Sequence, residues 1–282
     1  MNRPVDRLCD GRIVSGKIDS MEGISIMKLK DQVALITGAG RNIGKAMAKL
    51  FASEGAKIIV AEMHEARGQA VVDEINKSGA QASLVLGDVS KSADVQRMVK
   101  EAVGKFGAID ILVNNAALTD HANIFDSTEE EFDKVIAVSL KGPYLVTKYV
   151  AVQMKNQGRG GKVLNFGSTS GLVGRFDGIA YAAAKAGVIN MTRAMAVQLA
   201  EYGIRVNCIV PNRSGSPVGY DDDVAGSRTF QNLAGRLGTA DDQAKAALFL
   251  VSDDSSFIIG HPLIVDGGVM ATANFPREQF QK

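Results

Sequence analysis

Short runs of apolar and β-branched residues alternate with longer amphipathic segments over most of the chain. We expect strands at residues 32–36, 57–61, 83–86, 109–113, 162–166, 205–210 and 262–265. Spacers such as residues 65–77 and 91–106 show helical periodicity and are long enough for right-handed crossovers. Near-continuous apolar strands need cover on both faces. The pattern therefore predicts an α/β fold: a doubly wound, seven-stranded parallel sheet with helices on both faces and ligands beyond the carboxyl ends of its strands.

The same pattern predicts how the chain is divided. Residues 1–26 show a period of neither 2 nor 3.6, so we expect an N-terminal extension with little part in the core. No repeat or Pro-rich linker interrupts the rest of the sequence. We therefore expect residues 27–282 to form a single dinucleotide-binding catalytic domain, with a short substrate lid around residues 212–234.

Composition narrows the class of protein. Its 32 basic and 31 acidic side chains give a net charge of +1, which offers no surface for nucleic acid. Cys9 and Cys208 are the two cysteines and lie far apart, which indicates neither a disulfide framework nor a metal site. We expect no membrane span and no signal peptide, because apolar runs of about 20 residues and a leader-like apolar stretch are both missing from the sequence. A reducing compartment, the cytoplasm, is the expected location.

A glycine-rich turn, TGAGRNIG, follows the first predicted strand and opens a helix near Asn42. Glycines there let the backbone approach a pyrophosphate, and the free amides at the helix start bind the phosphates. Gly44 lets the helix lie close to the strand. The turn predicts a dinucleotide site made by Gly38, Gly40, Arg41, Asn42, Ile43 and Gly44.

An acidic residue ends the second predicted strand. Glu62 lies 18 residues after Gly44, where a carboxylate can bond a ribose diol. Because a carboxylate would repel the additional phosphate of NADP, Glu62 favours NAD, although the neighbouring Arg41 would favour NADP.

A second constellation lies near Ser168. Tyr181 and Lys185 are four residues apart in a helical pattern, so their side chains share one face. Tyrosine with a pKa near ~10 is a poor proton carrier at neutral pH, and a cation beside it would favour the phenolate. Ser168 could polarise the same substrate oxygen. These three residues are the candidate catalytic group.

Motifs along the chain from residue 27 to 268 resemble those of the short-chain dehydrogenase/reductase family. They are Thr37-Gly38 with Gly44, Asp88-Val89, Asn114-Asn115-Ala116, Ser168 with Tyr181 and Lys185, Arg205-Val206-Asn207 with Pro211, and Val265-Asp266-Gly267-Gly268. The resemblance implies a Rossmann fold and a nicotinamide cofactor. It also implies hydride transfer between that cofactor and an alcohol or ketone, with tyrosine exchanging a proton with the substrate oxygen.

The resemblance implies further residue roles. Lys185 would hold the nicotinamide ribose, Asp88 and Val89 would border the adenine, and Asn114 and Ala116 would line the path of the cofactor. The other cofactor-binding residues that it implies are Asn115, Ala117, Pro211 and Asn212.

Four places depart from the family's usual pattern. Asn42 replaces a glycine, which asparagine can do because it tolerates positive φ. Ser139 replaces an asparagine that helps to hold a water on the proton path to the lysine, so we expect a changed relay and unchanged hydride transfer. Asn212 replaces a glycine. Residues 217–234 are short for a substrate lid and contain three consecutive aspartates, which we expect to be solvated.

Two other function classes fit parts of the sequence. GSTSG around Thr169 resembles the nucleophile elbow of serine hydrolases, but its middle residue is threonine and the histidines are scattered. A non-catalytic nucleotide-binding or scaffold protein with a retained fold fits Ser139 and the short lid, whereas the intact Ser168, Tyr181 and Lys185 favour an enzyme.

Small and apolar residues recur at helical spacing after Tyr181. They are Ala182, Ala186, Met191, Ala194, Met195, Ala196 and Leu199. A core stripe explains such a pattern, and it also permits close contact between subunits. Together with the family's habit of pairing through this helix, it predicts a homo-oligomer, a tetramer or a dimer. The lid residues leave the alcohol or carbonyl substrate unidentified.

Overall fold

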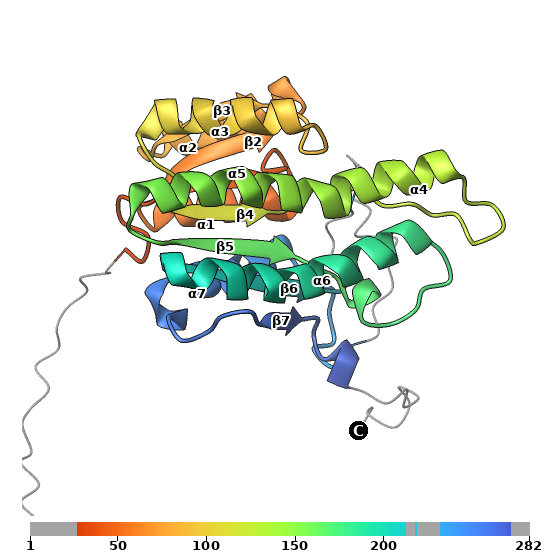
Figure 1. The fold of residues 1–282 in the computed structure, drawn as a ribbon. Helices are drawn as coiled ribbons and strands as arrows, with labels where there is room; N and C mark the ends of the chain where they lie inside the picture. Colours follow the sequence, from red (N-terminus) through yellow and green to blue (C-terminus); the bar gives the residue numbers. More distant parts are fainter. Residues whose placement is uncertain (1–26, 213–217, 219–231, 272–282) are drawn as a thin grey trace, which may run out of the picture.

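The computed structural model describes residues 27–212, 218 and 232–271. Within them, seven strands form one parallel sheet in the order β3-β2-β1-β4-β5-β6-β7 (Figure 1). The strands are β1 (Val33–Thr37), β2 (Lys57–Glu62), β3 (Ala82–Leu86), β4 (Ile111–Asn114), β5 (Gly161–Phe166), β6 (Ile204–Pro211) and β7 (Pro262–Val265). Every predicted strand is present, so the predicted fold class is confirmed.

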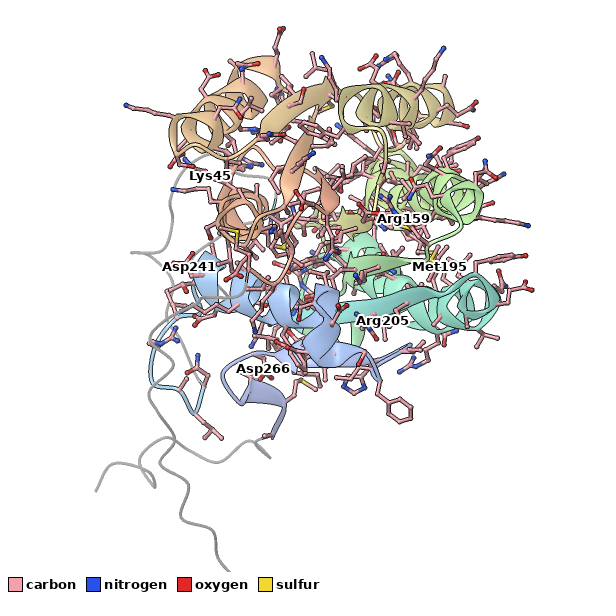
Figure 2. The ribbon with its side chains drawn as sticks, turned by 90° about the vertical axis from the view of Figure 1, so that its left-hand side faces the viewer. Lys45, Arg159, Met195, Arg205, Asp241 and Asp266 are labelled. Carbon is pink, nitrogen blue, oxygen red and sulfur yellow. The ribbon has the colours of Figure 1, made fainter. Side chains whose placement is uncertain are left out.

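Helices cover both faces of the sheet. They are α1 (Asn42–Ser53), α2 (Glu65–Lys77), α3 (Ser92–Phe106), α4 (Glu129–Ile136), α5 (Gly142–Gln157), α6 (Ile179–Leu199) and α7 (Ala240–Val251). The buried apolar residues of α1, α2 and α7 belong to one core cluster, and those of α3 and α5 belong to another, which Ala196 of α6 joins. Val188 and Ile189 of α6 pack in a smaller cluster against β6. Figure 2 shows the two layers, with Lys45 of α1 and Asp241 of α7 on one side and Met195 of α6 on the other.

The central strand shows why this sequence needs two helical layers. All five residues of β1 are buried. Side chains alternate along a strand, so Ala34 and Ile36 lie in the first core cluster while Val33 and Leu35 lie in the second. Burial on both faces makes an unbroken apolar run the stable choice for this strand.

The order of the strands places a crevice beside β1. From β1 the chain runs outward through β2 and β3, and then returns to add β4 on the other side of β1. The loops that follow β1 and β4 therefore diverge to opposite sides at the carboxyl edge of the sheet. Doubly wound sheets bind their ligands at such a reversal.

Among the described residues, one helical stretch, Glu129–Gln157, is long and apolar enough by length and composition to cross a membrane. Half of its most apolar window is buried inside the fold. The predicted extension at residues 1–26 lies outside the described residues, as does most of the predicted lid at residues 212–234.

Candidate functional site

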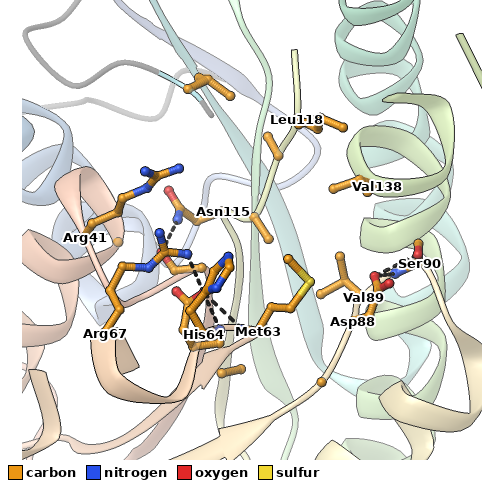
Figure 3. Close-up of a pocket in the computed structure, with 18 of the residues that line it drawn as sticks. Arg41, Met63, His64, Arg67, Asp88, Val89, Ser90, Asn115, Leu118 and Val138 are labelled. Carbon is orange, nitrogen blue, oxygen red and sulfur yellow. Dashed lines mark hydrogen bonds and ion pairs between the residues drawn. The ribbon is translucent and has the colours of Figure 1, made fainter. Parts of the chain in front are cut away.

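A cavity of about 450 Å³ opens at the carboxyl ends of β1, β2, β3 and β4 (Figure 3). It brings together most of the residues predicted to bind a cofactor. These are Gly38, Arg41, Asn42, Ile43, Gly44, Glu62, Asp88, Val89, Asn115, Ala116 and Ala117. A cavity is therefore present at the crevice beside β1, and most of the residues predicted to bind a cofactor line it.

The turn after β1 has the close packing expected of a phosphate-binding turn. A Cβ atom on Gly44 would lie 2.2 Å from the Gly38 carbonyl oxygen, so only glycine allows α1 to approach the strand this closely. Asn42 has a φ of 49°, the left-handed conformation expected for a residue in a glycine position. The first turn of α1, all of it described, carries no acidic side chain. The residues present thus fit the pyrophosphate of a dinucleotide.

Glu62 lies at the end of β2 with its side chain buried. One carboxylate oxygen accepts a 3.1 Å hydrogen bond from the Gly40 amide, and the other accepts bonds from the Met63 and His64 amides and from Arg67. Burial raises the pKa of Glu62, but the Arg67 guanidinium and the backbone donors outweigh it, and the net pKa is lowered. The side chain is therefore a carboxylate at neutral pH, fixed against the phosphate turn.

Arg67 is a site residue that the sequence analysis missed. Its Nη2 lies 2.8 Å from Glu62 Oε1, and the side chain lines the cavity. Figure 3 shows Arg41 and Arg67 together on one side of the cavity, opposite Val89 and Val138. Because Arg67 stands in the first turn of α2, five residues after Glu62, its spacing could have revealed it. This ion pair counters part of the negative charge that Glu62 presents to a phosphate.

The two asparagines after β4 have different roles. Asn115 lines the cavity, and its Nδ2 donates to the carbonyl oxygens of Thr37 and Gly38, which ties β4 to the phosphate turn. Asn114 was expected to line the cofactor path, but it is buried behind the cavity. Its Nδ2 donates to Thr147 and Asn165, so it joins β4 to α5 and β5.

Ser168, Tyr181 and Lys185 lie together where β5 ends and α6 begins. Tyr181 and Lys185 are in the first two turns of α6, and all three side chains are buried. Lys185 Nζ lies 5.5 Å from the centre of the Tyr181 ring and donates a 2.7 Å hydrogen bond to the carbonyl oxygen of Phe166. The predicted catalytic group is therefore assembled, with its cation anchored on β5.

The protonation state of Tyr181 differs from the one expected from the sequence. Burial raises the pKa of Tyr181, and the opposing effects of a hydrogen bond with Ser168 and the charge of Arg175 do not overcome it. Burial also lowers the pKa of Lys185 to about 8. The tyrosine is thus a neutral phenol at neutral pH, which is the form that donates a proton.

Ser139 forms part of a π-helical turn, Ala137–Lys141, between α4 and α5. Its hydroxyl donates a 2.7 Å hydrogen bond to the Leu118 carbonyl oxygen and accepts a 2.9 Å bond from the Leu118 amide. Serine therefore uses its hydroxyl to hold the loop after β4 against the helix. Its place in a proton relay to Lys185 stays a prediction.

Replacing Ser139 by alanine should lower the free energy of unfolding by about 1–3 kcal/mol, because both polar groups of Leu118 would lose a partner in the interior. Chemical denaturation measures the change. Thr147→Ser, which keeps a buried hydroxyl near Asn114, is the control for this stability measurement. In a separate experiment, Ser139→Asn introduces the longer polar side chain that the family usually has at this position, and it should shift the pH profile of turnover if the relay is altered. An alanine variant as stable as the unmodified protein would contradict the structural role.

Pro211 and Asn212 are placed differently from the other predicted cofactor residues. Pro211 ends β6, and the Asn212 side chain accepts a 3.1 Å hydrogen bond from Thr169. Asn212 lines a separate cavity of about 210 Å³, and neither residue lines the larger cavity. Their contact with a cofactor stays a prediction.

No group of three or more acidic, histidine or cysteine side chains that could hold a metal occurs among the described residues. His64 directly precedes the first residue of α2 and lines the larger cavity.

Comparison with known proteins gives the class of this site. Residues 38–270 match the family model described as Enoyl-(Acyl carrier protein) reductase. The chain is 39% identical to galactitol 2-dehydrogenase of Agrobacterium fabrum, with 86% of this chain and 98% of that protein covered. It is 37% identical to the 3-oxoacyl-[acyl-carrier-protein] reductase FabG of Thermotoga maritima, with 86% and 100% covered.

A solved structure agrees with these relatives. A short-chain type dehydrogenase/reductase from Mycobacterium marinum superposes with a TM-score of 0.82 at 32% identity, over 88% of this chain and 98% of that one. The chain belongs to the short-chain dehydrogenase/reductase family of oxidoreductases.

Proposed function

We propose that the protein transfers a hydride between NAD(H) and a secondary alcohol or ketone. The observation that carries the proposal is the assembly of Ser168, Tyr181 and Lys185 at the carboxyl edge of the sheet that also holds the cofactor-sized cavity. The family uses nicotinamide cofactors, and two relatives of this chain are named as a galactitol 2-dehydrogenase and a 3-oxoacyl-[acyl-carrier-protein] reductase.

The cofactor, when bound, supplies or accepts the hydride. Tyr181, neutral at rest, gives its phenolic proton to a carbonyl oxygen, or takes the proton of an alcohol in the reverse direction. Ser168 donates a hydrogen bond to the same oxygen. Lys185 remains anchored on Phe166 and stabilises the phenolate while Tyr181 lacks its proton. The division of roles gives one proton carrier and two groups that stabilise charge.

NAD(H) should bind more tightly than NADP(H), because the fixed carboxylate of Glu62 repels a phosphate on the ribose. Glu62→Ala should narrow the difference, because it removes that repulsion and the charge of Arg67 is no longer offset by the Glu62 carboxylate. Fluorescence titration of both cofactors into each protein measures the ratio of the dissociation constants.

Asp73→Ala is the matched control, because Asp73 is an exposed carboxylate on α2 that hydrogen-bonds Gln69 outside the cavity. It should leave the ratio unchanged. Equal affinities in the unmodified protein, or a preference for NADP(H), would contradict the assignment to NAD.

The alternative, a nucleotide-binding scaffold without turnover, gives a different experimental result. A panel of secondary alcohols and ketones, tested with each nicotinamide cofactor, separates the two. Turnover of any member supports the dehydrogenase, whereas cofactor binding without turnover of any member supports the scaffold.

We further propose a cytoplasmic homo-oligomer, either a tetramer or a dimer, built through α5 and α6. Val152 on α5 and Val197 on α6 are large apolar side chains exposed on one helical layer of the domain. Ala194 is exposed near Val197, which allows a close helix contact. Light scattering of the purified chain measures the assembly, and a monomer at working concentration would contradict it.

A further inference from the structure

Arg175 lies against the ring of the candidate proton carrier. The residue belongs to the loop between the short helix Thr169–Gly171 and α6. Its guanidinium carbon is 5.3 Å from the centre of the Tyr181 ring, and its Nη2 donates a 2.9 Å hydrogen bond to Asp177. The ring contact and the ion pair hold the cation beside the phenol from outside the catalytic group.

The other charges around Tyr181 are already engaged. Asp120 is buried, and its two carboxylate oxygens accept hydrogen bonds from the Ala180 and Tyr181 amides at the start of α6. Lys185 is buried and bonded to the Phe166 carbonyl oxygen. The side chain of Arg175, in contrast, is 24% exposed. Arg175 is therefore a cation in contact with the Tyr181 ring that an incoming molecule can reach.

The guanidinium also keeps donors for a ligand. Arginine has five N–H donors, and within the described parts of the chain Arg175 makes one hydrogen bond, to Asp177. A carboxylate can accept two parallel N–H bonds from such a group. The donors and the charge of Arg175 are thus suited to an anion that approaches Tyr181.

The same loop carries apolar surface. Leu172 and Val173, which precede Arg175, are 41% and 49% exposed. Covering these two side chains with an alkyl group would lower the free energy of binding, whereas a sugar-like polyol would not gain in this way. Cation and apolar surface lie within four consecutive residues of one loop.

We propose that Arg175 binds a carboxylate of the substrate, so that this oxidoreductase acts on hydroxy acids or oxo acids with a short alkyl chain. The inference rests on the proposed function, because it assumes that the reacting oxygen lies at Tyr181. The guanidinium bonds the carboxylate, Leu172 and Val173 contact the alkyl part, and the hydroxyl or carbonyl group meets Ser168 and Tyr181.

Paired substrates test the proposal on the full chain. The rate of NAD reduction is measured with 2- and 3-hydroxybutanoate and with the methyl ester of each acid. Arg175→Gln should lower kcat/KM for the preferred acid by about 10–100-fold, because a charge-assisted pair is lost, and should change the value for the matching ester by less than about threefold. Arg175→Lys should retain part of the preference. Arg97→Gln, an exposed arginine on α3, is the control.

Direct binding gives a readout that needs no turnover. Butanoate is titrated by calorimetry into the protein saturated with NADH. It should bind the unmodified protein and the Arg97→Gln variant, and it should lose most of its affinity for Arg175→Gln. No binding to the unmodified protein, or equal binding to both Arg175 variants and the unmodified protein, would overturn the proposal.

The outcomes also separate this inference from the proposed function. An enzyme that oxidises the esters and ignores the acids, or loses both equally in Arg175→Gln, contradicts the carboxylate site and keeps hydride transfer. A protein that binds butanoate through Arg175 but converts no alcohol or ketone keeps the anion site and contradicts hydride transfer.

Discussion

Replacing Tyr181 by phenylalanine should lower the turnover rate by about 10²–10⁴-fold while the cofactor still binds. The ring that contacts Lys185 and Arg175 stays in place, and only the phenolic hydroxyl is removed. Without that hydroxyl, the proton that accompanies the hydride has no positioned carrier. Single-turnover kinetics measure the loss, and cofactor titration shows that the site is otherwise intact.

A second tyrosine serves as the matched control. Tyr149 on α5 has a hydroxyl that hydrogen-bonds Ser92 on α3, and it lines neither of the two cavities. Tyr149→Phe should retain nearly full turnover. If Tyr181→Phe is as active as the unmodified protein on the same substrate, the assigned proton carrier is wrong.

Replacing Lys185 by methionine should abolish most of the turnover and weaken cofactor binding, yet stabilise the fold at neutral pH. A buried lysine whose pKa has fallen from 10.5 to about 8 is an ammonium group held where burial disfavours its charge. At pH values below the folded pKa, this shift lowers the stability of the unmodified protein by on the order of 3 kcal/mol. The variant avoids this cost but loses about 1 kcal/mol with the hydrogen bond to Phe166, so a net gain in stability remains. Methionine fills a similar volume without charge.

The gain in stability expected for Lys185→Met depends on pH. Between about pH 8 and 10.5 the unfolded chain keeps the lysine proton while the folded protein has lost it, so stability rises with pH in that window. The advantage of Lys185→Met over the unmodified protein should therefore be largest at pH 7 and shrink toward pH 10. Chemical denaturation of both proteins across this range measures the difference. An advantage that stays constant with pH would show that Lys185 is not the titrating group.

The sequence was sufficient for the elements whose signal is local. Strand periodicity predicted the parallel sheet, and the spacer at residues 65–77 became α2 with the same bounds. The glycine-rich turn was predictable because its conformation is set by residues next to one another, as the left-handed Asn42 shows. The serine, tyrosine and lysine could be chosen because their spacing follows helical geometry.

Features set by packing could not be predicted from the sequence. Burial around Tyr181 decides its protonation, and no spacing in the sequence reports how deeply a helix is buried. Arg175 lies in the loop before α6, and its contact with the Tyr181 ring depends on the path of that loop. Asn114 was expected to line the cofactor path, but its side chain lies in the interior because it hydrogen-bonds Asn165 on the neighbouring strand β5. The partner of Ser139, 21 residues away at Leu118, depends on the same long-range packing.

The π-helical turn Ala137–Lys141 lies between α4 and α5 and changes which side of this continuous helical segment faces the sheet. In Figure 1 α4 and α5 run on in one line, with this turn between them. One extra residue in a turn rotates everything before it by about 100° about the axis, relative to a regular helix. Over α5 the segment therefore presents Val146 and Val150 to the sheet, while over α4 it presents Val135 to Tyr181. The π-helical turn thus lets one continuous helical segment pack against the sheet through α5 and against Tyr181, the candidate proton carrier, through α4.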